Sequence, residues 1–125
     1  MQILNFSHPL TTEQMATLVT LMGDQKISGV KEVRCQVDQT ESLHPQARKL
    51  VDSVGWSPHQ WQSTPFILVP PGMAPVALAV CANVHGRCGY WPTILRLRPE
   101  GQPPKFVPAE LVGLDQLRDA GRMDR

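Results

Sequence analysis

The chain has 125 residues, of which 42% are hydrophobic and 18% are charged, and its formal net charge is +1. This length and composition predict a single folded domain, residues 1–125, with a real core, and argue against intrinsic disorder. The small net charge excludes the broad basic field that drives non-specific binding to duplex nucleic acid. A local cluster of cations still suffices for a small ligand that carries phosphates.

The first predicted element is a strand over residues 2–6, which the sequence Ser7-His8-Pro9 ends. A helix follows, because Thr11 and Gln14 have the spacing of a capping box and Gly23 supplies a stop. Its inner face is predicted from helical spacing to consist of Met15, Leu18, Val19 and Met22.

Residues 31–37 alternate between apolar and polar side chains, which predicts a second, half-exposed strand near an edge of the sheet. After the polar loop 38–42, Pro45 favours the start of a second helix, which Gly55 ends. The inner face of this helix is predicted to be Ala47, Leu50, Val51 and Val54. Residues 56–64 are interpreted as a loop.

The run Phe66-Ile67-Leu68-Val69 is apolar throughout, which is typical of a strand buried on both faces. The sequence Pro70-Pro71-Gly72 ends it with a tight turn, and Pro75 suits the first turn of a helix. Residues 76–84 are apolar almost all round, so this helix is expected to be buried on more than one side. Either Gly86 or Gly89 ends it.

The last elements are a strand over residues 93–97, a short strand over 106–111 and a helix over 114–120, with a frayed tail at 121–125. Strands and helices therefore alternate. This alternation predicts an α/β, Rossmann-like, doubly wound fold with a mostly parallel sheet of four to five strands and helices on both faces.

In such a sheet, ligands bind beyond the carboxyl ends of the strands. Four segments are expected at that edge: residues 7–9, 38–39, 70–72 and 98–99. The turn at Gly72 leads into a helix N-terminus, which attracts anions, although an ordinary turn between strand and helix is the alternative. Likewise, His8-Pro9 is either part of a site or only a turn. The predicted ligand-binding residues are Phe6, Ser7, His8, Pro71, Gly72, Met73 and Arg98.

His8 is the only acid–base candidate at this edge, and no other catalytic residue is predicted. Cys81, His85 and Cys88 share one helix face, but no fourth ligand is evident, so neither a metal site nor a cofactor is expected. The odd number of cysteines, with no recognisable signal peptide, favours free thiols and a cytoplasmic protein. No apolar run is long enough to span a membrane.

Three further side chains are expected at the opposite edge of the sheet. Trp56 and Trp61 are interpreted either as interface anchors or as a cap on the core. Arg87 is assigned to packing or to a subunit contact.

Several short segments, in this order, resemble the small CRISPR-associated Csx-fifteen family. They are Asn5-Phe6-Ser7-His8-Pro9-Leu10-Thr11, Val69-Pro70-Pro71-Gly72, His85-Gly86-Arg87-x-Gly89 before Trp91-Pro92, and Leu114-x-x-Leu117-Arg118-Asp119-Ala120. The resemblance spans nearly the whole chain.

The resemblance implies an accessory protein of type III CRISPR antiviral systems that binds a cyclic oligoadenylate, with cyclic tetra-adenylate the expected ligand. It also implies a homodimer or a higher homo-oligomer, because a two-fold symmetric ring suits a two-fold symmetric site. Such a protein lowers the messenger by sequestration or by slow, metal-independent ring opening, which makes it a binding protein or a ring nuclease. The alternatives are a small nucleotide-dependent enzyme and an interaction subunit without a small ligand.

Overall fold

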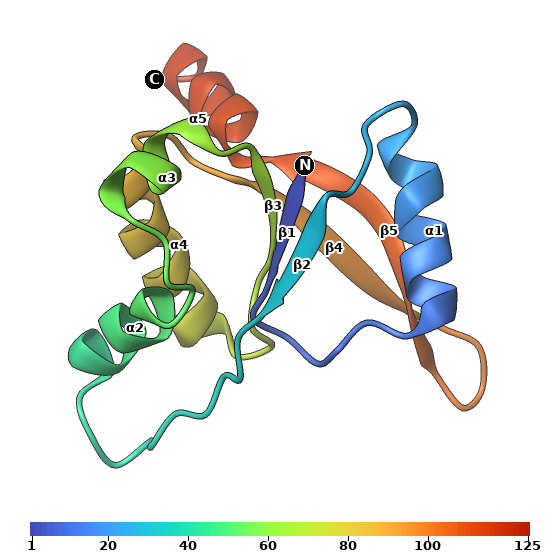
Figure 1. Cartoon of the computed structure of the whole chain (residues 1–125), viewed down its shortest axis with the longest axis horizontal. Coiled ribbons are helices and arrows are strands. Elements are labelled where there is room, and N and C mark those ends of the chain that lie inside the picture. Colours follow the sequence, from blue (N-terminus) through green and yellow to red (C-terminus); the bar gives the residue numbers. More distant parts are fainter.

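The computed structural model describes residues 1–125 and has an α/β, Rossmann-like fold (Figure 1). Its elements in chain order are β1 (Gln2–Asn5), α1 (Thr12–Met22), β2 (Gly29–Glu32), α2 (Leu43–Asp52), α3 (Pro58–Ser63), β3 (Phe66–Val69), α4 (Ala74–Cys88), β4 (Thr93–Glu100), β5 (Lys105–Gly113) and α5 (Leu114–Met123).

The five strands form one sheet in the order β2-β1-β3-β4-β5. The first four are parallel, and β5 pairs antiparallel with β4. The predictions that β3 is central and that the second strand lies at an edge are both confirmed. The carboxyl ends of β1, β2 and β3 meet at the lower edge of the sheet in Figure 1, and we call this the carboxyl edge and the opposite one the amino edge.

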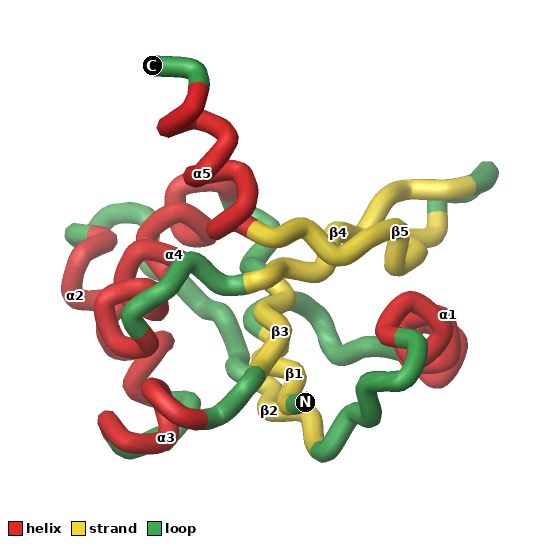
Figure 2. The backbone as a smooth tube through the Cα atoms, turned by 90° about the horizontal axis from the view of Figure 1, so that it is seen from above, coloured by secondary structure: helices red, strands yellow, loops and turns green.

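Helices cover both faces of the sheet, but unequally. Figure 2 shows α2, α3 and α4 together on one face, while α1 lies alone on the other and β4 and β5 bend towards it. The face under α2, α3 and α4 contains a cluster of 14 buried residues, whereas the α1 face contains 6. Because apolar burial is the main stabilising term, most of the folding free energy comes from the first face.

Strand β3 is buried on both faces, as its continuous apolar sequence predicts. Phe66 and Leu68 belong to the larger cluster, and Ile67 and Val69 belong to the smaller one. Alternate side chains of a strand point to opposite faces, so a strand between two helical layers has no polar position.

The predicted start of α1 and one of the two predicted stops of α4 agree with the structure. Thr11 and Gln14 form a reciprocal capping box at the start of α1. Gly89 ends α4 in the left-handed conformation, with φ of 89°, so it is the stop and Gly86 lies within the helix.

The interpretation of residues 56–64 as a loop is wrong, because they contain α3. Ser57 and Gln60 form a second capping box and Pro58 occupies the first turn. Trp61 is only 1% exposed and packs edge to face against Trp56 and Phe66, with ring centroids 4.9 and 5.8 Å apart. Trp61 is therefore part of the core.

Several strand and helix boundaries also differ from the prediction. Strand β4 continues to Glu100 rather than ending at 97, β5 is Lys105–Gly113 rather than 106–111, and α2 is Leu43–Asp52 rather than a helix that starts at Pro45 and is ended by Gly55. The second strand is Gly29–Glu32 rather than 31–37, since β1 is only four residues long and its last bond to this segment runs from the N–H of Val33 to the carbonyl oxygen of Asn5 at 2.8 Å. The last helix continues to Met123, three residues beyond its predicted end.

Two helix faces were predicted to be more buried than they are. Val19 in α1 is 53% exposed, because a single helix on this face contacts the sheet along only part of its circumference. Helix α4 buries one face, and Leu78 on its outer side is 73% exposed, so the expected burial on more than one side is wrong for the single chain.

Candidate functional site

The loop after β1 and the turn after β3 lie side by side at the carboxyl edge, because β1 and β3 are neighbours and Asn5 pairs with Val69. The backbone N–H of Phe6 donates to the carbonyl oxygen of Val69 at 2.9 Å, which extends the pairing by one residue. Phe6 itself is fully buried and anchors the loop in the core. The pairing of two central strands thus brings the predicted residues 6–8 and 71–73 together.

Asn5 fixes the shape of this loop. Its side chain is fully buried, accepts from the backbone N–H of Ser7 at 2.9 Å and donates to the carbonyl oxygen of His8 at 2.9 Å. These two bonds satisfy backbone groups that no strand pairs, and they turn Ser7 and His8 outward. Asn5 is not among the predicted site residues, although an asparagine at a strand end is a recognisable turn signal.

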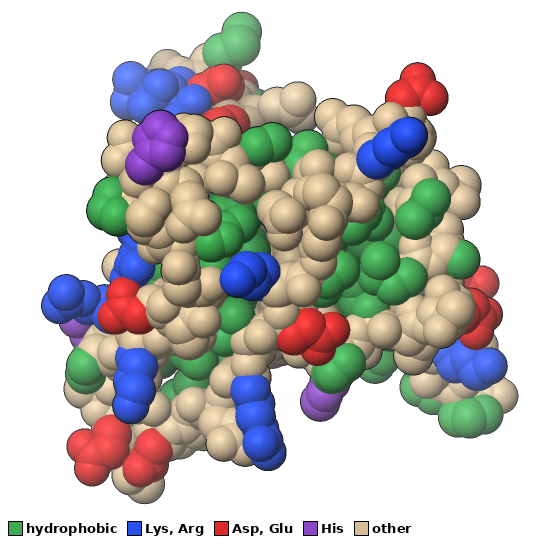
Figure 3. All heavy atoms as spheres, viewed as in Figure 1, with side chains coloured by type: hydrophobic (Ala, Val, Ile, Leu, Met, Phe, Trp, Pro, Cys, Tyr) green, Lys and Arg blue, Asp and Glu red, His purple; other side chains and the backbone are tan.

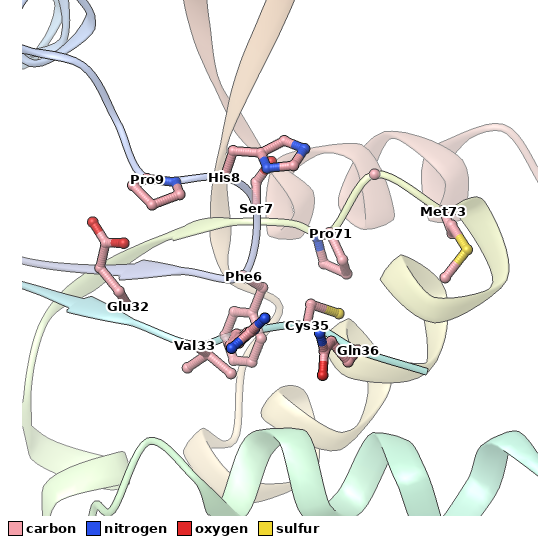
Figure 4. Close-up of a pocket in the computed structure, with 12 residues that line it drawn as sticks. Phe6, Ser7, His8, Pro9, Glu32, Val33, Cys35, Gln36, Pro71 and Met73 are labelled. Atoms are coloured by element: carbon pink, nitrogen blue, oxygen red, sulfur yellow. The ribbon is translucent and has the colours of Figure 1, made fainter. Parts of the chain in front are cut away.

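A hollow of about 700 Å³ opens between this loop, the turn after β3 and the chain that follows β2. We call it the β2-side hollow. It is lined by Phe6, Ser7, His8, Pro9, Glu32, Val33, Arg34, Cys35, Gln36, Pro71, Gly72 and Met73 (Figure 4). Figure 3 shows a notch at this edge with basic, acidic and histidine side chains around it. Six of the seven predicted ligand-binding residues line the hollow.

Arg98, the seventh, lines neither this hollow nor its neighbour. Strand β4 pairs with β3 only through Thr93 and Ile94 and then runs six residues further, which carries Arg98 away from the ends of β1 and β3. There it forms an exposed ion pair with Glu100 at 3.8 Å.

The cation that lines the β2-side hollow is Arg34, which the sequence analysis did not select. Arg34 was interpreted as the polar side of a strand over 31–37, whereas β2 ends at Glu32 and Arg34 follows its carboxyl end. It takes part in none of the five ion pairs of the protein. The same rule that selected residues after the other strands would have selected it, had the strand been given its true end.

The polar groups around the hollow are not used by the protein itself. The Ser7 hydroxyl, the His8 ring and the Arg34 guanidinium form no hydrogen bond within the chain, and only the backbone of Ser7 and His8 bonds to Asn5. Free donors around a concave surface are available to a ligand.

Helix α4 begins at this hollow with an open N-terminus. Its N-cap residue, Met73, makes no side-chain cap, in contrast to the capping boxes of α1 and α3. The first intrahelical bond runs from Ala77 to Met73, so the N–H groups of Ala74 and Val76 have no partner in the helix. The helix dipole therefore adds a positive potential beside Gly72 and Met73.

Gly72 is not required by backbone conformation. Its φ is not positive, and a Cβ atom placed on it meets nothing within 4 Å. The protein itself accommodates a side chain at this position. What Gly72 provides is open space above the start of α4.

The loop after β2 is held beside the hollow by Gln46 of α2. Its side chain accepts from the N–H of Asp38 at 2.8 Å and donates to the carbonyl oxygens of Asp38 and Ser42 at 2.9 and 3.0 Å. Gln39 then reaches Met73, with its Nε2 atom 3.6 Å from the sulfur. This side of the hollow is therefore connected to α4.

None of the three cysteines forms a disulfide. Cys35 lines the hollow, and burial raises the pKa of its thiol, so it is protonated at neutral pH and is a poor nucleophile. Cys81 and Cys88 are buried in the larger core cluster, and burial likewise raises the pKa of each thiol. His85 stacks on Trp91 with ring centroids 4.4 Å apart.

No three His, Cys, Asp or Glu side chains are placed to hold a metal ion. None of the helices has both the length and the apolar character needed to cross a membrane.

No family model, curated protein or solved structure matches the chain. Around the β2-side hollow lie one free guanidinium, one carboxylate (that of Glu32), one hydroxyl, one imidazole and an open helix N-terminus.

Proposed function

We propose that the protein binds a cyclic oligoadenylate, cyclic tetra-adenylate first among them, and thereby lowers the free concentration of this messenger in type III CRISPR signalling in the cytoplasm. The observation that carries the proposal is the set of free polar groups around the β2-side hollow, contributed by Ser7, His8 and Arg34. A phosphodiester accepts hydrogen bonds from all three groups, and it carries the negative charge that Arg34 and the α4 N-terminus attract.

Cyclic tetra-adenylate has a two-fold symmetry that a homodimer can match, so the proposal includes a dimer that contributes two Arg34 side chains to one ring. A single chain offers only one free guanidinium at the hollow. Analytical ultracentrifugation with and without the ring tests this part, and a monomer under both conditions would contradict it.

Sequestration is favoured over ring opening by the surroundings of His8. Ring opening requires a ribose 2′-hydroxyl to attack the adjacent phosphorus and displace the 5′-oxygen, which leaves a 2′,3′-cyclic phosphate and a 5′-hydroxyl. The proton of the attacking hydroxyl needs an oriented base, and the leaving oxygen needs a proton. The His8 ring has no partner that orients it, and Cys35 is held protonated.

The direct test incubates the purified protein with cyclic tetra-adenylate and measures both retained ligand and linear products. We expect retention with little or no product. The substitution Arg34→Ala is expected to weaken binding about ten- to a hundredfold, because a charge-assisted phosphate contact contributes about 1.5–3 kcal/mol. Arg122→Ala removes the same charge from the exposed end of α5 and serves as the matched control.

Two variants at Gly72 distinguish an effect on ligand binding from an effect on folding. Gly72→Ala is expected to keep native stability, since its Cβ meets no atom within 4 Å. Gly72→Glu adds bulk and negative charge beside the α4 N-terminus, and we expect it to abolish detectable binding while the protein stays folded. Unchanged affinity in both Gly72→Glu and Arg34→Ala would move the site away from this hollow.

The substitution His8→Ala distinguishes the two modes of action. A protein that only sequesters loses a modest part of its affinity. A ring nuclease loses more turnover than affinity, because the lost group acts in the transition state.

A further inference from the structure

A second hollow lies on the other side of the loop after β1. It has a volume of about 740 Å³, and we call it the β4-side hollow. Ser7, His8, Pro9 and Gly72 line both hollows and so form a ridge between them. The other lining residues that matter here are Gln14, Arg96, Leu97, Phe106 and Val112. A ligand on the ridge reaches into both hollows.

The walls of the β4-side hollow are mainly apolar. Leu97 and Val112 are half-buried on β4 and β5, and Phe106 at the rim is 56% exposed. Gln14 holds this rim in place, because its Nε2 atom donates to the carbonyl oxygen of Phe106 at 2.8 Å. This bond fixes the backbone at Phe106, and the exposed ring offers an aromatic face to a flat group.

The only cation that lines this hollow is Arg96, and its charge is already compensated. Arg96 bonds to Glu110 at 3.2 Å, and both side chains are about half exposed. This distinguishes the β4-side hollow from the β2-side hollow, where Arg34 has no acidic partner. The free guanidinium of Arg34 therefore favours a phosphate on its side of the β2-side hollow, which the carboxylate of Glu32 also lines, and an uncharged group suits the β4-side hollow.

The backbone of β4 supplies polar groups to the same hollow. Its pairing with β3 stops at Ile94, and the strand continues to Glu100 with β5 on one side only. From Arg96 onward, the backbone N–H and C=O groups on the β3 side have no strand partner. Such an edge offers alternating donors and acceptors to the rim of a flat ring.

We infer that the β4-side hollow is a nucleobase subsite, which takes an adenine of the ligand while the adjoining phosphate lies across the ridge towards Arg34. The inference rests on the proposed function. The faces of the base contact the apolar walls and the ring of Phe106, and its polar edge meets the free edge of β4. Pockets for such ligands are predominantly apolar with a few placed polar groups, as this one is.

The experiment measures cyclic tetra-adenylate affinity by titration calorimetry for Phe106→Ala, Phe106→Trp and Val112→Phe. We expect Phe106→Ala to weaken binding about five- to a hundredfold, the range for losing one base–aromatic stack. Phe106→Trp keeps the stack and should bind at least as well as the original protein. Val112→Phe fills the hollow and should weaken binding without altering Phe106. Leu117→Ala, at a residue 60% exposed on α5, is the control for losing an exposed apolar side chain.

The outcomes separate the two hypotheses. If the unmodified protein does not bind the ring, the proposed function fails and the subsite fails with it. If the protein binds and Arg34→Ala weakens binding, while Phe106→Ala and Val112→Phe fold normally and bind like the original, the function stands and the base subsite is overturned. Weaker binding in both of the latter variants, with affinity retained in Phe106→Trp, supports the subsite.

Discussion

The two edges of the sheet use their polar side chains in opposite ways. At the amino edge, Arg87 bonds to Asp52 at 2.7 Å and to Asn83 at 2.9 Å, which ties α4 to α2. Asp115 accepts from the backbone N–H of Trp91 at 3.0 Å and pairs with Arg118 at 3.1 Å. At the carboxyl edge, the side chains of Ser7, His8 and Arg34 around the β2-side hollow form no hydrogen bond or ion pair within the protein, whereas the sulfur of Met73 accepts from Gln39.

This difference indicates where stability resides and where a ligand is expected. The amino edge also holds the aromatic cluster of Trp56, Trp61, Phe66 and Tyr90, with centroid distances from 4.9 to 6.1 Å. The bonded and buried side chains of the amino edge contribute to folding, whereas the unbonded Ser7, His8 and Arg34 side chains beside the hollow are free to contact a ligand.

The largest expected effect on stability comes from a substitution in the aromatic cluster at the amino edge. Trp61→Ala removes a nearly fully buried ring that touches Trp56 and Phe66, and we expect it to lower the free energy of unfolding by about 3–5 kcal/mol. Chemical denaturation measures the change. His59→Ala, at an exposed position on the same helix, should change stability by less than about 0.5 kcal/mol. A loss below 1 kcal/mol for Trp61→Ala would contradict the assignment of the main core to this side.

The next largest effect is expected for Asn5, the buried polar side chain at the carboxyl edge. Asn5→Ala leaves the N–H of Ser7 and the carbonyl of His8 without partners, and should lower the free energy of unfolding by about 1–3 kcal/mol. Because the loop is then no longer held in shape, ligand affinity should also fall about tenfold.

The matched variant at the amino edge is Asp115→Ala. It also removes the acceptor of a backbone N–H, that of Trp91, and should lower the free energy of unfolding by about 1 kcal/mol. Its affinity for the ligand should be unchanged. Equal effects of Asn5→Ala and Asp115→Ala on affinity would remove the functional distinction between the edges.

The smallest effect is expected for Asp52→Asn. The carboxylate is 65% exposed and its partner Arg87 is 26% exposed, so solvent screens most of the attraction. The variant should lose no more than about 1 kcal/mol, and less in high salt. Thermal unfolding at two salt concentrations tests this. A loss above 2 kcal/mol would show that this ion pair is a major tie between α2 and α4.

The sequence alone determined the local elements and their alternation. The continuous apolar run at 66–69 and the capping box at Thr11 act through short-range periodicity and backbone preferences, so they can be read without the fold. The sequence left both Gly86 and Gly89 open as the end of α4, and the structure selects Gly89. The alternation of strands and helices then predicts a parallel core, and with it the convergence of residues 6–8 and 71–73 at one edge.

Only the tertiary structure decided the features that depend on the residue at which two strands stop pairing. The length of β1 ends β2 at Glu32, which turns Arg34 from a strand residue into the cation of the hollow. The extension of β4 past β3, with β5 antiparallel beside it, carries Arg98 away and opens the β4-side hollow. Pairing between strands distant in sequence fixes these features, and no local propensity encodes the register at which such pairing ends.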